Sequence, residues 1–410
     1  MHYSTYFLIF LVLISMLSQA ICTELASKEE EQGINKFNEG ISSFSREFYQ
    51  QSAATTSGNI IISPFSVAMA LSLLSQATNG TTFDELRAGL HLNMDKVAIA
   101  DQFHQYYRLV EKSAGQSKLI VANQIFVQQG IPLNTDFQEV ATKQFFSGVE
   151  PVDFVRNIDT AKTINDYVKQ KTIEKIQEFV TPEMFDESTR LFSVNTIYLK
   201  SKWAKPFNKG ETFKGDFYIN ENEKVIVDFM FTKCKCPMAI LDDLDSTALS
   251  LPYANSSLSF VIVLPNNRTG LQALESQLAN YDLSRINYSV SKYGPFVIIP
   301  KFKIESKFNL NEILKKMGMR SMFGRNADLG GLFNPPFGKN LYVADVLHKA
   351  IIEINEMSTE VAAATGVRSI LTSSAIRYFS AAHPFVYFIW DNETKTSLFS
   401  GRVTNLPPST

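Results

Sequence analysis

The chain has 410 residues, of which 45% are hydrophobic and 20% are charged, and its formal net charge is -2. This apolar content supports a large folded core and excludes a largely disordered chain. The nearly balanced charge gives no bulk attraction to nucleic acid or to an anionic membrane, so we expect neither as a partner.

The first residues have the pattern of a secretory leader. An apolar run of about eleven residues is too short to span a bilayer, and the small residues Ser18 and Ala20 follow it. We therefore predict a signal peptide over residues 1–20, cleaved after Ala20 or, at the rival site, after Cys22.

Five Asn-x-Ser/Thr sequons fit the same secreted destination. Each would offer an asparagine for glycosylation if the chain enters the secretory pathway. The candidate glycosylation sites are Asn79, Asn255, Asn267, Asn287 and Asn392.

Cys234 and Cys236 are separated by a single lysine. That spacing is too short for an unstrained bridge between the two, and no nearby His or Cys completes a zinc site. We therefore expect free thiols, no metal and no cofactor.

The rest of the chain forms one continuous unit. We expect a flexible acidic tail over residues 21–33 and a single domain over residues 34–406. No internal repeat, low-complexity tract or Pro/Gly linker divides this span.

Helix signals come first along the domain. Ser63 followed by proline is typical of an N-cap with proline at the first helical position, and it predicts a helix that ends near Asn79. Thr82 with Glu85 predicts a capping box for the next helix. Apolar residues at helical spacing predict a surface helix over residues 159–179.

Strand signals concentrate in the second half of the chain. Apolar runs rich in β-branched and aromatic residues predict strands over 191–199, 248–253, 258–264, 296–304 and 384–390. Helices followed by strands give an α+β fold and argue against a doubly wound βαβ order.

The most informative segment follows residues 351–356 (IIEINE) near the C-terminus. About twenty residues separate this strand from the next, which is long for a connection in a compact protein and indicates a function. Laid out as a strand, the segment presents one small or apolar face, made of Thr359, Val361, Ala363, Thr365, Val367, Ser369 and Leu371. This pattern would let the segment enter an existing sheet, although a helical turn over 360–364 is the alternative for the uncleaved chain.

The start of this segment, EMSTEVAAATG, resembles the hinge of the serpins, whose pattern is close to E-x-G-T-E-A-A-A-A-T. Ser358 stands where the family usually has Gly, and Val361 stands where it usually has Ala. Similar motifs occur in the family's order at residues 59–86, 194–207, 343–356 and 379–403. The resemblance covers nearly the whole domain and implies three sheets, surrounding helices and an exposed reactive loop over residues 357–378.

This resemblance implies that a target protease cleaves the loop as a substrate, and that the hinge then inserts into the main sheet as an extra strand. The implied hinge residues are Glu356, Ser358, Thr359, Glu360, Val361, Ala362, Ala363, Ala364 and Thr365. The family's spacing puts the reactive bond between Thr372 and Ser373, with Leu371 as the rival position. Thr372 favours elastase-like targets and Leu371 favours chymotrypsin-like ones.

Further residues carry both a plain reading and one implied by the resemblance. His348 is either a hydrogen-bonded core histidine or the residue that closes the shutter, where the sheet parts. Trp203 is either buried bulk or part of the breach, where insertion begins, and we expect Glu356 to pair with Lys301. The remaining implied shutter residues are Asn195, Ser63 and Ser66.

Common catalytic motifs, such as G-x-S-x-G, H-E-x-x-H and the Walker loop, do not occur, so we expect no enzyme. The resemblance implies a secreted, monomeric inhibitor that binds an extracellular serine protease covalently. The alternative is a non-inhibitory serpin acting as a carrier, ligand-binding or storage protein, which the hinge departures favour. A basic run more often forms a solvated loop than a glycosaminoglycan site, and it comprises Lys200, Lys202, Lys205, Lys209 and Lys214.

Overall fold

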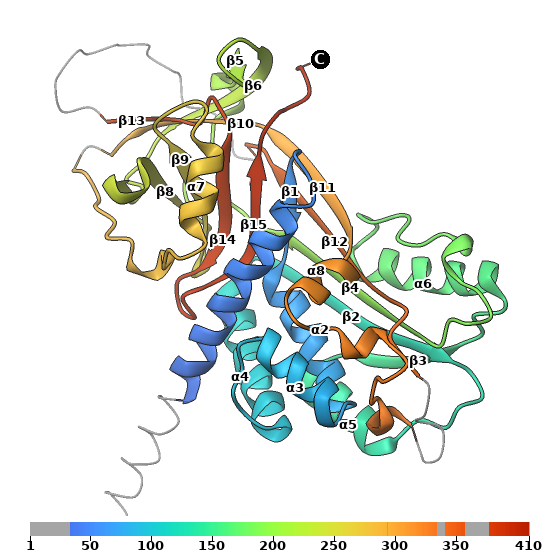
Figure 1. Ribbon diagram of the computed structural model, residues 1–410. Coiled ribbons are helices and arrows are strands. Elements are labelled where there is room, and N and C mark those ends of the chain that lie inside the picture. Colours follow the sequence, from blue (N-terminus) through green and yellow to red (C-terminus); the bar gives the residue numbers. More distant parts are fainter. Residues whose placement is uncertain (1–32, 293, 334–340, 357–376, 410) are drawn as a thin grey trace, which may run out of the picture.

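The computed structural model describes residues 33–292, 294–333, 341–356 and 377–409, which form three sheets and surrounding helices (Figure 1). The α+β class predicted from the sequence is confirmed. The predicted signal peptide and nearly all of the acidic tail lie outside the described residues, as does the reactive loop up to residue 376.

The five-stranded sheet has the order β11-β12-β4-β2-β3. β12 runs antiparallel to β11 and parallel to β4, β4 runs antiparallel to β2, and β2 runs parallel to β3. The strands are β11 (Phe302–Asn309), β12 (Asp345–Ile354), β4 (Leu191–Lys200), β2 (Lys118–Gln128) and β3 (Gly148–Val152).

The six-stranded sheet has the order β1-β15-β14-β9-β8-β7, and all its neighbours are antiparallel. Its first strand, β1, pairs with β15 near the end of the chain. The strands are β1 (Ile60–Ile62), β15 (Thr396–Val403), β14 (Phe385–Asp391), β9 (Leu258–Pro265), β8 (Ser246–Pro252) and β7 (Met238–Leu241).

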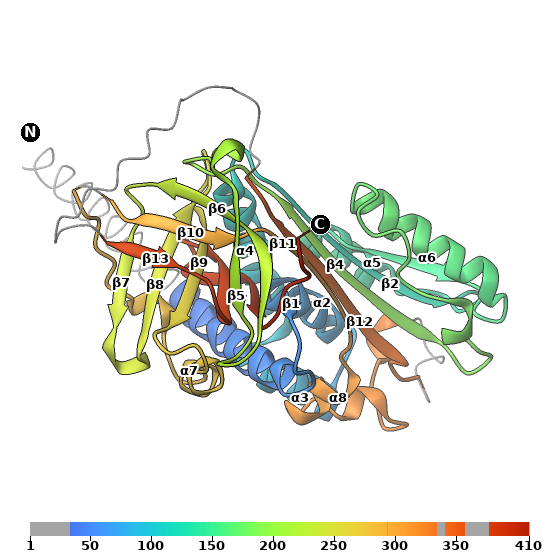
Figure 2. The same cartoon turned by 90° about the horizontal axis from the view of Figure 1, so that it is seen from above.

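The four-stranded sheet has the order β13-β10-β6-β5, and Figure 2 shows it from above. Its strands are β13 (Tyr378–Ser380), β10 (Phe296–Pro300), β6 (Lys224–Lys233) and β5 (Phe213–Tyr218). The single strand predicted over 296–304 is wrong, because the chain changes sheets at Lys301. Pro300 lacks an N–H donor and is the one local mark of this crossing.

Most of the described helices lie in the first half of the chain, and α7 (Leu271–Leu278) and α8 (Asn311–Lys316) follow in the second half. The others are 33–53, α2 (Pro64–Gln76), α3 (Gly80–Gly89), α4 (Lys96–Ala114), α5 (Thr135–Phe145) and α6 (Asn157–Lys171). Short 3-10 turns lie at Pro182–Met184, Lys209–Glu211, Asp242–Leu244, Leu283–Arg285, Ser321–Phe323 and Gly330–Leu332. No described helix is long and apolar enough to cross a membrane.

Helix starts agree only partly with the sequence signals. The Ser63 side chain caps α2 by accepting a hydrogen bond from the Ser66 amide, as predicted. The capping box is wrong, because α3 already begins at Gly80. Thr82 instead accepts from the Asp328 amide at 3.0 Å, and Glu85 accepts from Ser321. The predicted helix over 159–179 corresponds to α6, which ends at Lys171. Ile173 takes a positive φ two residues later, so the predicted helix does not continue to residue 179.

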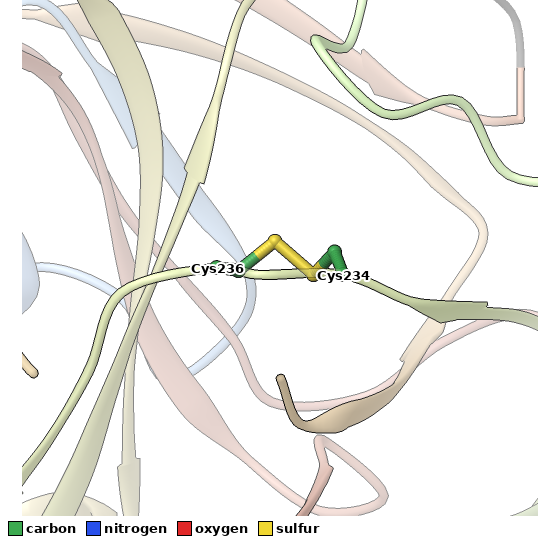
Figure 3. Close-up of a disulfide and its surroundings, with 2 residues drawn as sticks. All are labelled: Cys234 and Cys236. Carbon is green, nitrogen blue, oxygen red and sulfur yellow. A yellow bond between two sulfur atoms is a disulfide. The ribbon is translucent and has the colours of Figure 1, made fainter. Parts of the chain in front are cut away.

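Cys234 and Cys236 form a disulfide (Figure 3). The expectation of free thiols is therefore wrong. The single-residue spacing does not prevent the bridge, because the backbone after β6 places the two Cα atoms 5.1 Å apart, within the usual range for bridged cysteines.

Candidate functional site

The contact line between β12 and β4, here called the seam, lies inside the five-stranded sheet. The two strands pair in parallel from Asp345 opposite Phe192 to Ile351 opposite Tyr198. β12 leads directly toward residue 357, where the predicted loop begins. A segment that turned back after β12 and entered the seam would run antiparallel to both strands, which is the slightly stronger pairing.

One face of the seam packs on α6 (Figure 2). Buried Ile164 and Val168 of this helix form an apolar cluster with Phe126, Val194 and Leu347 from three neighbouring strands. The contacts hold α6 across β2, β4 and β12. Any strand that entered the seam would widen the sheet beneath this helix.

Five polar residues, here called the seam cluster, meet in the middle of the seam: Ser63, Ser66, Asn123, Asn195 and His348. Asn123, Asn195 and His348 stand directly opposite one another on β2, β4 and β12. All five are buried. A polar group buried without a partner would cost roughly 1–3 kcal/mol, so their bonding has to be nearly complete.

Hydrogen bonds join the whole seam cluster. His348 Nδ1 lies 2.5 Å from Asn195 Oδ1, which also accepts from Ser66 Oγ at 2.9 Å. Asn195 Nδ2 donates to Asn123 Oδ1 at 2.5 Å and to the Ser66 carbonyl at 2.7 Å. The Ser63 amide donates to His348 Nε2 at 2.9 Å. The N-terminus of α2 thus holds a side chain on each side of the seam.

The bonding fixes the tautomer of His348. The Ser63 amide can only donate, so Nε2 is the acceptor and Nδ1 carries the proton that Asn195 Oδ1 accepts. Burial lowers the pKa of His348 to about 3. If Nε2 were also protonated, its N–H would face the N–H of Ser63 and the hydrogen bond between them would be lost. The neutral ring is therefore the form that fits the closed seam.

The family resemblance implied that His348 bonds near Asn195 and Ser63 or Ser66, and hydrogen bonds in the structure join all four. Their role in opening the sheet stays a prediction. Asn123 was missed. A polar residue within the apolar strand VANQIF was the available signal.

The seam already diverges at the end nearest the predicted loop, here called the breach. Its pairing stops at Ile351 and Tyr198, although both strands continue. A small pocket of about 40 Å³, open to solvent, lies at that end, lined in part by Leu199, Ser201, Trp203, Tyr253, Ile352 and Ile354. An incoming segment would find its first space here.

Trp203 occupies the breach. Its ring stacks on Tyr253 with centroids 4.9 Å apart, and its Nε1 donates to the Asn355 carbonyl at 2.9 Å. The indole therefore holds the chain one residue before Glu356. Tyr253 was not predicted as part of the site.

Glu356 is the last described residue before the predicted loop, and its side chain is only 5% exposed. Its carboxylate lies 3.1 Å from Lys301 Nζ and accepts from Thr212 Oγ1 at 2.6 Å. Burial opposes its ionisation, but hydrogen bonds from Thr212, its own backbone and Lys301 outweigh burial and lower its pKa. Thr212 was missed because nothing in the local sequence links it to residue 356.

The other predicted site residues either lie outside the described residues or are exposed on the surface. The hinge from Ser358 to Thr365 and the reactive-bond candidates Leu371, Thr372 and Ser373 lie outside the described residues. The five sequon asparagines and the five lysines of the basic run are all exposed. Among the described residues, no cluster of three or more His, Cys, Asp or Glu could hold a metal ion.

Comparison with known proteins decides the family. The family model described as serpin (serine protease inhibitor) matches residues 39–406. The chain belongs to the serpin family. The model describes this family as serine protease inhibitors, and several relatives of the chain are named as inhibitors of proteases.

The similarity extends over nearly the whole chain. This serpin is 34% identical to Ipis-1 of Ixodes persulcatus, over 89% of the chain and 98% of that protein. It is 32% identical to a leukocyte elastase inhibitor of Xenopus laevis, over 85% of the chain and 94% of that protein. The crystal structure of Serpin48 of Tenebrio molitor, described as a highly specific serpin, has a TM-score of 0.80 and 31% identity, over 91% of this chain and 99% of that one.

Proposed function

We propose that this serpin is a secreted, monomeric suicide substrate that traps extracellular serine proteases covalently. The observation that carries the proposal is the parallel seam, which lies beside the strand that leads into the predicted loop and is already parted at the breach. A segment freed by cleavage would find a place beside the strand from which it emerges. Cleavage of the loop would then be followed by insertion of the freed segment into the five-stranded sheet.

The proposed reaction begins as ordinary proteolysis. The protease serine attacks the carbonyl carbon of Thr372, the peptide bond to Ser373 breaks, and the amine of Ser373 takes up the proton and leaves with β13. Thr372 stays joined to the protease as an ester. Insertion of residues 357–372 would carry that ester along β12, whose ten residues span about 33 Å.

The hinge composition sets the speed of insertion. Each inserted residue gains strand hydrogen bonds worth about 1 kcal/mol and costs roughly 1–2 kcal/mol of ordering, so burial of side chains decides the balance. Thr359 is small enough to enter at the breach. Val361 suits a strand but adds bulk to the inward face, which slows insertion relative to deacylation.

We propose elastase-like or chymotrypsin-like proteases as targets. Thr372 suits the first class and Leu371 the second. Arg368 lies too close to the hinge for full insertion, and Arg377 lies beyond the proposed bond. Relatives named leukocyte elastase inhibitor support the elastase-like class.

The decisive experiment incubates the protein with elastase and chymotrypsin and follows it by denaturing electrophoresis and mass spectrometry. We expect a covalent adduct, a released peptide that begins at Ser373, and a higher melting temperature for the cleaved chain. Thr359→Arg would place a charge on the inserting face, so it should leave cleavage intact and abolish the adduct. Glu360→Arg puts the same charge on the opposite face and is the matched control.

A non-inhibitory carrier, ligand-binding or storage serpin is the second candidate. Ser358 and Val361 favour it, because both depart from the family hinge in ways that hinder insertion. Clean cleavage near Thr372, with no adduct from either protease, would support this candidate and contradict the trap.

We also propose secretion, with cleavage of the leader after Ala20. The apolar leader and the exposed sequon asparagines support it. Expression of the full chain in animal cells should deliver protein to the medium with Ile21 as its first residue and with a mass that falls on deglycosylation. Retention of the uncleaved chain inside the cells would contradict the proposal.

A further inference from the structure

The outer face of the four-stranded sheet carries a row of aromatic side chains, here called the aromatic row. It consists of Tyr378 on β13, Phe296 on β10 and Phe231 on β6. The ring centroids of Tyr378 and Phe296 lie 5.2 Å apart, and those of Phe296 and Phe231 lie 5.7 Å apart, both stacked. Lys233 adds its ammonium group over the Phe296 ring at 5.1 Å.

Strand register explains why these rings line up. Phe296 stands opposite Tyr378 on one side and Lys233 on the other. Alternate residues point inward, since Val297 is fully buried and Phe379 is 2% exposed. Tyr378 is 60% exposed and the other two rings are half-buried. The row is therefore an outward surface and not part of the core.

Such a surface is costly for a protein that leaves it in water. Stacked, half-exposed aromatic rings beside a cation resemble the anchors of protein interfaces, where Tyr, Phe and Trp are enriched. Lys233 contacts the Phe296 ring, and no described carboxylate forms an ion pair with it. The surface thus suits a partner that offers apolar side chains and an acidic group.

The short stretch of chain between the proposed reactive bond and Tyr378 indicates that the partner is the target protease. Tyr378 lies five residues after Ser373, so it can be no farther than roughly 18 Å from the proposed reactive bond in any conformation. A protease that holds this bond in its cleft must bring the rim of the cleft within that distance. Phe231 lies two strands farther across the sheet, or about 10 Å, which is still under the footprint of a bound protease.

We propose that the aromatic row is a docking surface for the target protease, and that it recognises the rim beside the half of the cleft that binds residues after the reactive bond. The inference rests on the proposed function, because it takes the loop as the segment that the protease attacks. The row would speed the encounter and select among proteases that share one cleavage preference. Lys233 adds attraction to an acidic rim, which acts mainly on the association rate.

The test compares Phe231→Ser, Tyr378→Ser and Lys233→Glu with the parent chain. Ile226→Ser is the matched control, since Ile226 is a 55% exposed residue of the same strand on its opposite face. The second-order rate constant of adduct formation should fall about tenfold for the two aromatic variants and stay at the parent value for the control. Lys233→Glu should slow the reaction most at low salt. The fraction of protease trapped per cleaved chain should not change.

Unchanged rates in Phe231→Ser and Lys233→Glu would overturn the inference, even if the parent traps protease well. If the parent sediments as a dimer and the variants as monomers, while their rates stay unchanged, the row is the contact with a second copy of the chain. That result would also overturn the inference. If the parent is cleaved without an adduct, the trap fails but docking is still measured, because the variants should then be cleaved about tenfold more slowly. Thermal unfolding of every variant checks that the fold is intact, and Tyr378→Ser with Lys233→Glu decides the matter if Phe231→Ser does not fold.

Discussion

The neutral imidazole of His348 makes the stability of this serpin depend on pH in a calculable way. In the unfolded chain the ring has its ordinary pKa of 6.5, whereas burial lowers the pKa to about 3 in the folded state. The unfolded state therefore binds more protons below pH 6.5. The contribution of His348 is fully present above that pH and is lost as pH falls toward about 3.

The size of the effect follows from the two pKa values. Between about pH 7.5 and pH 5, the free energy of unfolding should fall by about 2 kcal/mol through His348 alone. His348→Gln removes the titrating group, so its unfolding free energy should decline by about 2 kcal/mol less over the same interval. Burial also lowers the pKa of His383, but that residue stays in both chains and its contribution cancels.

Urea unfolding at several pH values measures the difference directly. His104→Gln, which replaces a half-buried histidine outside the seam cluster, is the control for the loss of a histidine elsewhere in the chain. Parallel curves for the parent and His348→Gln would refute the reasoning. They would mean that the folded protein accepts a proton on His348 as readily as the unfolded chain does.

Two further predictions concern charged groups. Glu356→Ala removes the bonds to Lys301 and Thr212, so the free energy of unfolding should fall by about 1–2 kcal/mol in urea titrations, and an unchanged value would show that the contacts contribute nothing. Arg402 pairs with the buried carboxylate of Glu275 at 2.9 Å, so Arg402→Met should cost about 3–5 kcal/mol. Adding Glu275→Gln should recover part of that loss, whereas additive losses would contradict the pairing.

Local patterns predicted elements whose determinants are also local. Ser63 caps α2 through a residue three positions away, so sequence alone was sufficient for that start. The Thr82 and Glu85 signal failed because both side chains bind backbone groups from residues 321–328, which are distant in sequence. The crossing at Lys301 failed for a related reason. Both sides of it read as strand, and only the sheets decide which neighbours each half joins.

The candidate site shows the same division. Resemblance to the family brought together His348, Asn195 and the serines of α2, but no pattern shows the register that aligns Asn123 with them. Register depends on the pairing of whole strands, which local sequence does not specify. The disulfide was missed because the sequence does not show the backbone conformation after β6 that places the two Cα atoms 5.1 Å apart.

The pairing of β1 with β15 constrains how the protein is made. Ile60 stands opposite Arg402, so a strand synthesised early waits for almost the entire chain before its partner leaves the ribosome. Until then the apolar strand Ile60–Ile62 lacks its hydrogen-bonded partner in the sheet, and such an unpaired strand is prone to aggregation. A nonsense mutation that removed residues 396–410 would therefore destabilise the fold far more than the loss of so short a segment suggests. It would delete β15, which lies between β1 and β14 in the six-stranded sheet.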